Sequence, residues 1–360
     1  SALSTDGGTY LTESTALSLD AQSVSINRVV ADGTNAASTA DAQSDVVAGT
    51  AVVLQTLDGG ITSEASNGDV SAGGDVLLSS GQVSATAVDI TLGATVTSTG
   101  GSISMVSAGG VSQAATGDVS AQTAGESIDV QAATGIAMAD GALTQTNNGN
   151  VRYQALGGDI TLGEINAGTG NVALLASASV LDLATDTSTV DVTAAGLLVT
   201  AGTAIGAGDN PLETTVDTLS AQSTTGGTFV IESTAVSLDT VSVSANRVGG
   251  DGSAVAMTAV TQSDMVAGAA LVLATVDGAI TSVVTDGDVT AAGNVLISGQ
   301  GASASLVLAG DVSSTAANVT VISAGDVNQT GSIAASAATM TVDVQAATGI
   351  AMADGALTQT

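Results

Sequence analysis

Hydrophobic and polar residues alternate along this sequence in short runs rather than in helical stripes. The runs Val70–Ala72, Ile90–Leu92 and Ile103–Met105 each place a Ser or Thr between two apolar residues. Because successive side chains of a strand point to opposite faces, this period of two predicts short β-strands that bury one face. A sustained spacing of three and four residues, as in an amphipathic helix, is not found. The chain is therefore predicted to be all-β.

A Gly-Asp or Gly-Asn pair precedes many of these runs, as at Gly158-Asp159. Gly, Asp and Asn tolerate left-handed backbone conformations and therefore suit sharp corners. Asn150, Asn171 and Asp191 mark three such corners at nearly even spacing along the chain. A corner that returns about every 20 residues predicts the turns of a parallel β-helix, filled by stacked Val, Ile, Leu and Ala. At ~4.8 Å per turn, the chain would form roughly 18 turns and a rod of about 85 Å.

The sequence also repeats over a longer distance. Gly7–Tyr10 returns as Gly226–Phe229, and many other short stretches return with nearly the same offset. Residues 1–219 are interpreted as a first long repeat of the solenoid, and residues 220–360 as a second, truncated one. Together they are expected to form one continuous rod that is a fragment of a longer chain.

The composition excludes several classes of protein. The 360 residues include no Cys and no His, three aromatic residues and one Pro. Without Cys or His there is no disulfide framework, thiol nucleophile or imidazole base. Three aromatic side chains cannot fill a wide globular core, whereas a narrow β-helix needs none. A single Pro also fits, because Pro cannot donate to a paired ladder.

The charge is strongly negative, with 34 acidic residues against 3 basic ones and a net charge of −31. Such a chain repels nucleic acid and anionic membrane surfaces. Its apolar runs are also far shorter than the ~18–20 residues of a membrane-spanning helix. We therefore expect neither nucleic-acid binding nor membrane insertion.

Four stretches carry a resemblance to a known family: Gly157–Leu162 (GGDITL), Gly168–Leu174 (GTGNVAL), Thr200–Gly206 (TAGTAIG) and Asn210–Val216 (NPLETTV). They resemble the repeats of filamentous-haemagglutinin-type bacterial surface proteins. The resemblance implies a right-handed parallel β-helix and a secreted adhesin or surface fibre.

On this interpretation the protein is a structural extracellular fibre or adhesin stalk at the bacterial cell surface, or a filament of a biofilm matrix. Its partners would be copies of itself, end to end or side by side in a filament, and glycans of host or neighbouring cells. No catalysis and no catalytic residues are expected.

A calcium-binding repeat module that stiffens or bundles surface fibres is the alternative function. Ca²⁺ takes six to eight oxygen ligands, which stacked corner carboxylates supply. Asp is equally a good turn residue that faces water, and the Gly-Gly-x-Gly-x-Asp repeat of calcium-binding β-rolls does not recur. Ca²⁺ is accordingly the one cofactor considered. The candidate ligands all precede a Gly: Asp32, Asp58, Asp140, Asp251, Asp277 and Asp286.

A β-helical carbohydrate-active enzyme is the weaker alternative. Paired carboxylates hydrolyse glycosidic bonds, and Asp182, Asp186 and Asp191 lie close together in the sequence. The lack of His and the shortage of aromatic residues to stack on sugars argue against this function.

Two further pairs occupy matching places in the long repeats. Arg28 matches Arg247, and we expect both guanidinium groups to be solvated, because surface ion pairs contribute only ~0–1 kcal/mol. Tyr10 matches Phe229. These two rings are expected to plug places where the solenoid widens or bends.

Overall fold

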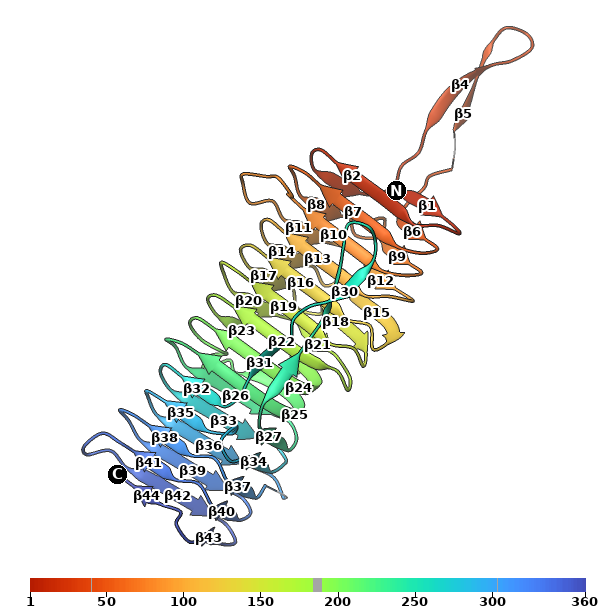
Figure 1. The fold of residues 1–360 in the computed structure, drawn as a ribbon. Coiled ribbons are helices and arrows are strands. Elements are labelled where there is room, and N and C mark those ends of the chain that lie inside the picture. The colour runs from red at the N-terminus through yellow and green to blue at the C-terminus, as the bar shows by residue number, and fades with distance from the viewer. Residues whose placement is uncertain (40, 184–189, 303) are drawn as a thin grey trace.

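Parallel strands stack on one another along almost the whole chain (Figure 1). The computed structural model describes residues 1–39, 41–183, 190–302 and 304–360. Among these residues there is no helix, and hence none that is long and apolar enough to cross a membrane. The strands wind into a right-handed parallel β-helix, as the sequence predicts, but they form about 13 turns rather than 18.

The predicted length of one turn is wrong. A turn contains about 24 residues rather than 20. Val46, Val70 and Val96 lie above one another in consecutive turns, and each step between them is longer than predicted. The 21-residue step from Asn150 to Asn171 also joins consecutive turns, but it belongs to a part of the rod whose turns contain fewer residues. With ~4.8 Å between turns, the rod is about 60 Å long rather than 85 Å.

Each turn of the first half contributes one strand to each of three ladders. The first ladder stacks β1 (Ala2–Ser4), β6 (Val46–Ala48), β9 (Val70–Ala72), β12 (Val96–Ser98), β15 (Val119–Ala124), β18 (Leu143–Asn147) and β21 (Glu164–Asn166). The second ladder stacks β2 (Thr9–Glu13), β7 (Val52–Thr56), β10 (Val76–Ser80), β13 (Ile103–Ser107), β16 (Ile128–Ala132), β19 (Val151–Ala155) and β22 (Asn171–Ala176). The third ladder stacks β3 (Leu17–Leu19), β8 (Ile61–Ser63), β11 (Ile90–Leu92), β14 (Val111–Gln113), β17 (Ile136–Met138), β20 (Ile160–Leu162) and β23 (Val180–Asp182).

Two long strands, β24 (Val192–Ala201) and β25 (Leu212–Ser223), continue the first and second ladders together. Three ladders follow them. One stacks β26 (Thr228–Glu232), β33 (Leu271–Thr275), β36 (Val295–Gly299), β39 (Val319–Ser323) and β42 (Val342–Ala346). The next stacks β27 (Val236–Leu238), β34 (Ile280–Ser282), β37 (Leu306–Leu308), β40 (Val327–Gln329) and β43 (Ile350–Met352). The last stacks β32 (Met265–Ala267), β35 (Val289–Ala291), β38 (Val312–Ser314), β41 (Ile333–Ala335) and β44 (Thr358–Gln359).

The second long repeat starts about one ladder further round the rod than the first. In the sequence β26 matches β2, yet Thr228 of β26 pairs with Ile205, which pairs with Val180 of the third ladder. The end of β25, which matches β1, likewise lies on the second ladder. The shift arises because one long repeat does not fill a whole number of turns. The boundary between the repeats falls inside β25, and the ladders run through it.

The interior of the rod is a column of aliphatic side chains. Along the second ladder, from β7 to β22, the first inward residue of each strand is completely buried, and these residues stack turn on turn: Val52, Val76, Ile103, Ile128, Val151 and Val172. Stacked Val and Ile pack well because β-branched side chains suit a pleated surface. The core is thus the one that the alternation predicts.

The aromatic residues behave differently from the prediction. Tyr10 is 57% exposed, and Phe229 also lies outside the rod, beside Gly208. The period of two explains both positions, because the inward places next to Phe229 are taken by Thr228 and Val230. Neither ring plugs the interior. The aromatic residue inside the rod is Tyr153, whose hydroxyl is 2.6 Å from Thr144 Oγ1.

Side chains of Asp and Asn at the corners join successive turns. Asp69 Oδ1 accepts hydrogen bonds from the backbone N–H (2.8 Å) and the hydroxyl (2.9 Å) of Thr95 in the next turn. Many of the acidic residues therefore satisfy backbone donors that the ladders leave unpaired at the corners. Other corner residues that accept from a backbone N–H one turn on are Asp45, Asp75, Asp89, Asp118, Asn150, Asp159, Asp264, Asp288, Asn294 and Asp311.

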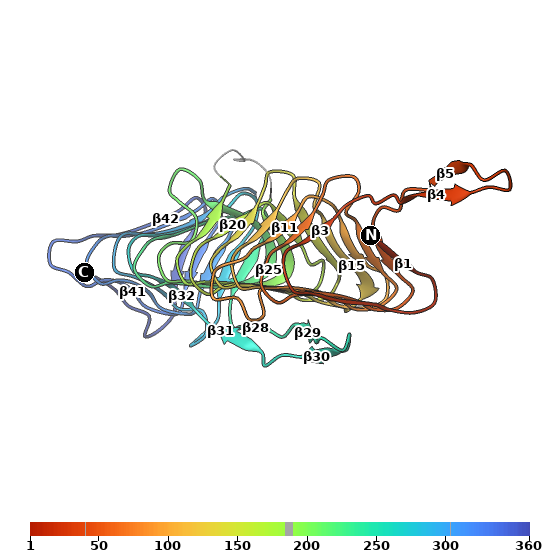
Figure 2. The ribbon, with the colours of Figure 1, turned by 90° about the horizontal axis from the view of Figure 1, so that it is seen from above.

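Two hairpins leave the rod at matching places in the two repeats. The first, here called the free hairpin, spans residues 24–39 and pairs β4 (Ser25–Val29) with β5 (Asn35–Thr39). It projects past the N-terminal end of the rod, and both of its strands are exposed (Figures 1 and 2). The second, here called the docked hairpin, spans residues 241–262 and lies along the outside of the rod (Figure 2). It pairs β28 (Val241–Val243) with β31 (Val260–Gln262), and β29 (Asn246–Val248) with β30 (Ala254–Ala256).

The docked hairpin packs on the outer face of the second ladder. At its root, Val241 and Val243 contact Ala173 and Leu198. Towards its tip, Val248 joins a buried apolar cluster on the strands of the first turns, with Val53 and Leu77. The hairpin therefore reaches back over most of the first long repeat.

An ion pair also holds the docked hairpin, which corrects the expectation that Arg247 is solvated. Arg247 Nε lies 2.6 Å from Asp129 Oδ2, and Arg152 Nε lies 2.8 Å from Asp129 Oδ1. The carboxylate of Asp129 is fully buried between the two guanidinium groups. Arg28, in the free hairpin, is exposed as expected.

Candidate functional site

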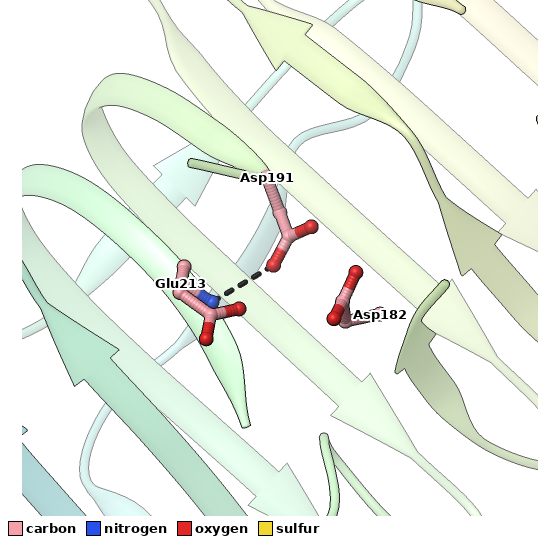
Figure 3. Close-up of side chains that lie close together, drawn as sticks. All are labelled: Asp182, Asp191 and Glu213. Carbon is pink, nitrogen blue, oxygen red and sulfur yellow. Dashed lines mark hydrogen bonds between the residues drawn. The ribbon is translucent and has the colours of Figure 1, made fainter. Parts of the chain in front are cut away.

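Three carboxylates converge inside a corner near the middle of the rod. They belong to Asp182, Asp191 and Glu213, and one oxygen of each lies within 4.8 Å of the others (Figure 3). In the part of the chain that the structure describes, this is the one group of three or more side chains of the types that bind metal ions.

The stacking of turns brings these residues together. Asp182 ends β23, Asp191 is the corner residue before β24, and Glu213 is the second residue of β25. Asp191 Oδ2 accepts a hydrogen bond of 2.8 Å from the backbone N–H of Glu213. This is the same corner bond that links other turns. The site is thus a corner of the ordinary kind to which two further carboxylates have been added.

Burial determines the protonation of the cluster. The exposed fraction is 6% for Asp182 and 2% for Asp191, while Glu213 is half-buried. The pKa of Asp191 is raised to about 9. Loss of solvation is the main cause, and the neighbouring charges of Asp182 and Glu213 add to it. At neutral pH Asp191 therefore holds a proton.

The chemistry of the cluster suits a hard cation. Carboxylate oxygens are the ligands that Ca²⁺ prefers, and a bound cation would favour the charged form of Asp191 that burial disfavours. Arg152 and Arg247 both bind Asp129 instead of this cluster. Proton sharing and cation binding are two ways to reduce the repulsion among the three carboxylates.

The six Asp residues predicted as calcium ligands are exposed. Asp32 accepts hydrogen bonds from Thr34, and Asp251 from Ser253, each inside its own hairpin turn. These bonds lower the pKa of both carboxyls. Among the described residues no three of the six come together. The other four predicted calcium ligands, beside Asp32 and Asp251, are Asp58, Asp140, Asp277 and Asp286.

The carboxylates singled out for glycoside hydrolysis are partly brought together. Asp182 and Asp191 lie side by side, and Asp186 lies outside the described residues. Glu213 was missed. A signal for it exists, because it follows Asp191 by 22 residues, close to the step from Asn150 to Asn171.

A shallow depression of about 350 Å³ lies on the outside of the third ladder, with Asp89 and Asp159 at its two ends. The two residues precede strands three positions apart, which separates them by about 14 Å. Catalytic carboxyl pairs of glycosidases are about 5–9.5 Å apart. The depression therefore lacks that arrangement.

Comparison with known proteins adds no further assignment. No protein-family model matches the chain, and no curated protein and no solved structure matches it either. The fold is accordingly established by the ladders themselves, and the resemblance to filamentous-haemagglutinin repeats stays a prediction.

Proposed function

We propose that the protein is a structural rod of an extracellular bacterial fibre or adhesin stalk, of the filamentous-haemagglutinin type. The observation that carries the proposal is the unbroken column of buried aliphatic residues inside continuous parallel ladders. Such a molecule has length and stiffness, and the depression over its third ladder is shallow. Its function is then to hold two points apart.

The mechanism is mechanical. Each turn is joined to the next by backbone hydrogen bonds on three sides and by the corner Asp and Asn side chains, so that no single contact bears an axial load alone. A net charge of −31 keeps neighbouring rods from aggregating laterally. Three Arg and no Lys leave trypsin few sites, and two of the Arg side chains are bound to Asp129.

The absence of catalysis belongs to the same proposal. Asp182 and Asp191 are nearly inaccessible, so a polysaccharide would not reach them without local opening. The exposed carboxylates serve turns and corners. Binding of surface glycans would then use the rod's exposed hydroxyl and carboxylate groups rather than a deep site.

Surface labelling of intact cells of the source bacterium tests this function. An antibody against the rod is expected to stain unpermeabilised cells or the surrounding matrix, and electron microscopy of the purified chain is expected to show straight rods. Staining that requires cell lysis would contradict the extracellular role. Compact particles would contradict the rod itself.

A calcium-binding module is the second candidate, favoured by the convergence of Asp182, Asp191 and Glu213. Calcium is expected to raise the melting temperature of the chelator-treated protein, because Ca²⁺ binds the folded cluster alone. The Asp191→Asn and Glu213→Gln variants are expected to lose this response. An identical melting temperature of the wild type in Ca²⁺ and in EDTA would rule out the calcium function.

A further inference from the structure

The free and docked hairpins have matching sequences but opposite environments. Val243, Ala245 and Val248 of the docked hairpin have exposed fractions of 0%, 1% and 2%. Their counterparts in the first long repeat, Val24, Ile26 and Val29, are 63%, 55% and 68% exposed. The free hairpin therefore presents three large apolar side chains at places that its counterpart buries. Single exposed apolar residues are ordinary, but three on one hairpin indicate a docking element.

The surface that receives the docked hairpin has three kinds of contact. Val53 and Leu77 supply the apolar part, with exposed fractions of 2% and 3% beneath Val248. Asp129 supplies the charge for Arg247. Gln131 Oε1 adds a hydrogen bond of 2.8 Å from Arg247 Nη1.

Serine hydroxyls make the third kind of contact, with the hairpin backbone. The N–H of Asn246 donates to Ser127 Oγ at 2.7 Å, and the N–H of Val248 donates to Ser104 Oγ at 2.9 Å. These bonds satisfy donors on a strand that faces the rod. The hairpin is thus recognised through its backbone, its apolar side chains and its Arg together.

The same set of residues recurs on the second long repeat. Val272 and Leu296 stand where Val53 and Leu77 stand, on β33 and β36, and the sequence around Asp343 repeats that around Asp129. Val272 and Leu296 are half-buried and Asp343 is exposed, so this face is more open than its counterpart. Hydroxyl and amide groups are retained at the other places: Thr320 for Ser104, Thr341 for Ser127 and Gln345 for Gln131.

We propose that the free hairpin of one chain docks on this face of a second copy of the chain, across β33, β36, β39 and β42. Arg28 then pairs with Asp343 and Gln345, and Val29 packs on Val272 and Leu296. The backbone N–H groups of Asn27 and Val29 donate to the hydroxyls of Thr341 and Thr320. Each contact copies one that the docked hairpin already makes.

The occupant is a second copy because, within these 360 residues, the free hairpin cannot reach the face of its own rod. The free hairpin projects past the N-terminal end of the rod, whereas β33 to β42 belong to the opposite half (Figure 1). Arg28 and Asp343 have opposite charges, which favours the contact in a chain that is otherwise repulsive. A contact between two different surfaces joins copies head to tail and leaves both ends open for further copies.

The contact uses the half of the hairpin from Asn27 to its tip. The counterparts of Ala173 and Leu198, which support the root of the docked hairpin, fall outside the second repeat of this sequence. Association is therefore expected to be weaker than the docking within one chain. The proposed docking deepens the proposed function by naming how rods join. It rests on the rod-like fold and not on an extracellular location.

Cysteine cross-linking tests the proposal, because the protein has no Cys of its own. The Val29→Cys/Leu296→Cys variant is expected to form disulfide-linked oligomers under mild oxidation. Val248→Cys/Leu77→Cys is the positive control and is expected to cross-link within one chain. Val29→Cys/Val307→Cys is the negative control, since Val307 is 38% exposed on a different ladder. Oligomers no more abundant than in the negative control would overturn the proposal.

A charge exchange provides a second readout. Arg28→Asp is expected to weaken association at least about tenfold in sedimentation velocity, since it places two carboxylates together. Combining Arg28→Asp with Asp343→Arg is expected to restore it. Unchanged association of the single variant would contradict the docking. Both residues are exposed, so the variants leave the rod intact, and circular dichroism checks this independently of any surface role.

Discussion

Arg247 binds Asp129 across 118 residues of sequence, with 2.6 Å between Nε and Oδ2. The other oxygen of the same carboxylate binds Arg152 at 2.8 Å. One buried carboxylate therefore compensates two guanidinium groups, one from the rod and one from the docked hairpin. These ion pairs add to the apolar and serine contacts that hold the docked hairpin on the rod.

Replacing Asp129 by Ala is predicted to destabilise the protein by about 3–5 kcal/mol, because it leaves the buried guanidinium group of Arg152 and the partly exposed one of Arg247 without a counter-charge. The measurement is the urea midpoint at neutral pH. Asp343→Ala is the matched control, since Asp343 occupies the same place in the second repeat but is exposed. Its effect is expected to stay within about 0.5 kcal/mol at low protein concentration. Equal effects of the two substitutions would contradict the role of the ion pairs.

The pKa of Asp191 predicts a pH dependence. Burial raises it to about 9 in the folded chain, from an ordinary value of 3.8. Between these values the folded chain keeps a proton that the unfolded chain has released. The contribution of Asp191 to the free energy of unfolding should therefore be largest below about pH 4 and fall as the pH rises towards 9.

Asp191→Asn removes this titration and keeps an oxygen that accepts from the N–H of Glu213. With EDTA present, the variant is predicted to be more stable than the wild type at pH 8, by at least about 1 kcal/mol, and equally stable near pH 4. Urea unfolding at pH 4, 6 and 8 measures the difference. A variant that is less stable than the wild type at pH 8 would show that Asp191 is charged in the folded chain.

The corner bonds predict a further contrast. Asp69→Ala removes the acceptor for the N–H and hydroxyl of Thr95 and is expected to cost about 1–2 kcal/mol. Asp69→Asn keeps an acceptor oxygen and should retain most of the stability. Asp140→Ala, at an exposed turn, is expected to be nearly neutral. Thermal unfolding of the three variants ranks them, and a neutral Asp69→Ala would show that the corner bonds add nothing.

Glycines at another corner stack so closely that adding one methyl group is predicted to destabilise the rod. A Cβ on Gly73 would overlap the carbonyl oxygen of Gly49 in the preceding turn, and a Cβ on Gly100 that of Gly73. Gly73→Ala is therefore expected to destabilise the rod by about 1–3 kcal/mol. At Gly349 a Cβ would meet its nearest neighbour at 3.4 Å, an ordinary contact, so Gly349→Ala is the control. Chemical denaturation distinguishes them. Similar midpoints would mean that the turns move apart at little cost.

Local pattern was enough to predict the fold class. Runs such as Val70–Ala72 show which residues face inward, and corner Gly and Asp show where strands end. The length of a turn was not predictable from the spacing of Asn150 and Asn171, because corners elsewhere contain more residues. Neither was the outward position of Tyr10 recognised, although the same alternation dictates it.

Contacts between distant turns account for what the sequence did not reveal. Arg28 and Arg247 have the same neighbours in the sequence, and only the position of Asp129 separates a solvated side chain from a bound one. Asp182, Asp186 and Asp191 were singled out together from their proximity in the chain. Glu213 was not, because it comes from the following turn. Whether carboxylates face water or one another depends on such stacking.

The shift of the second repeat by about one ladder has a consequence for anything attached to the rod. Two hairpins rooted at the same point of the repeat therefore project from the rod in different directions around its axis. In an array of such repeats, successive hairpins would be arranged helically around the axis. A neighbour approaching from any direction would then meet one of them.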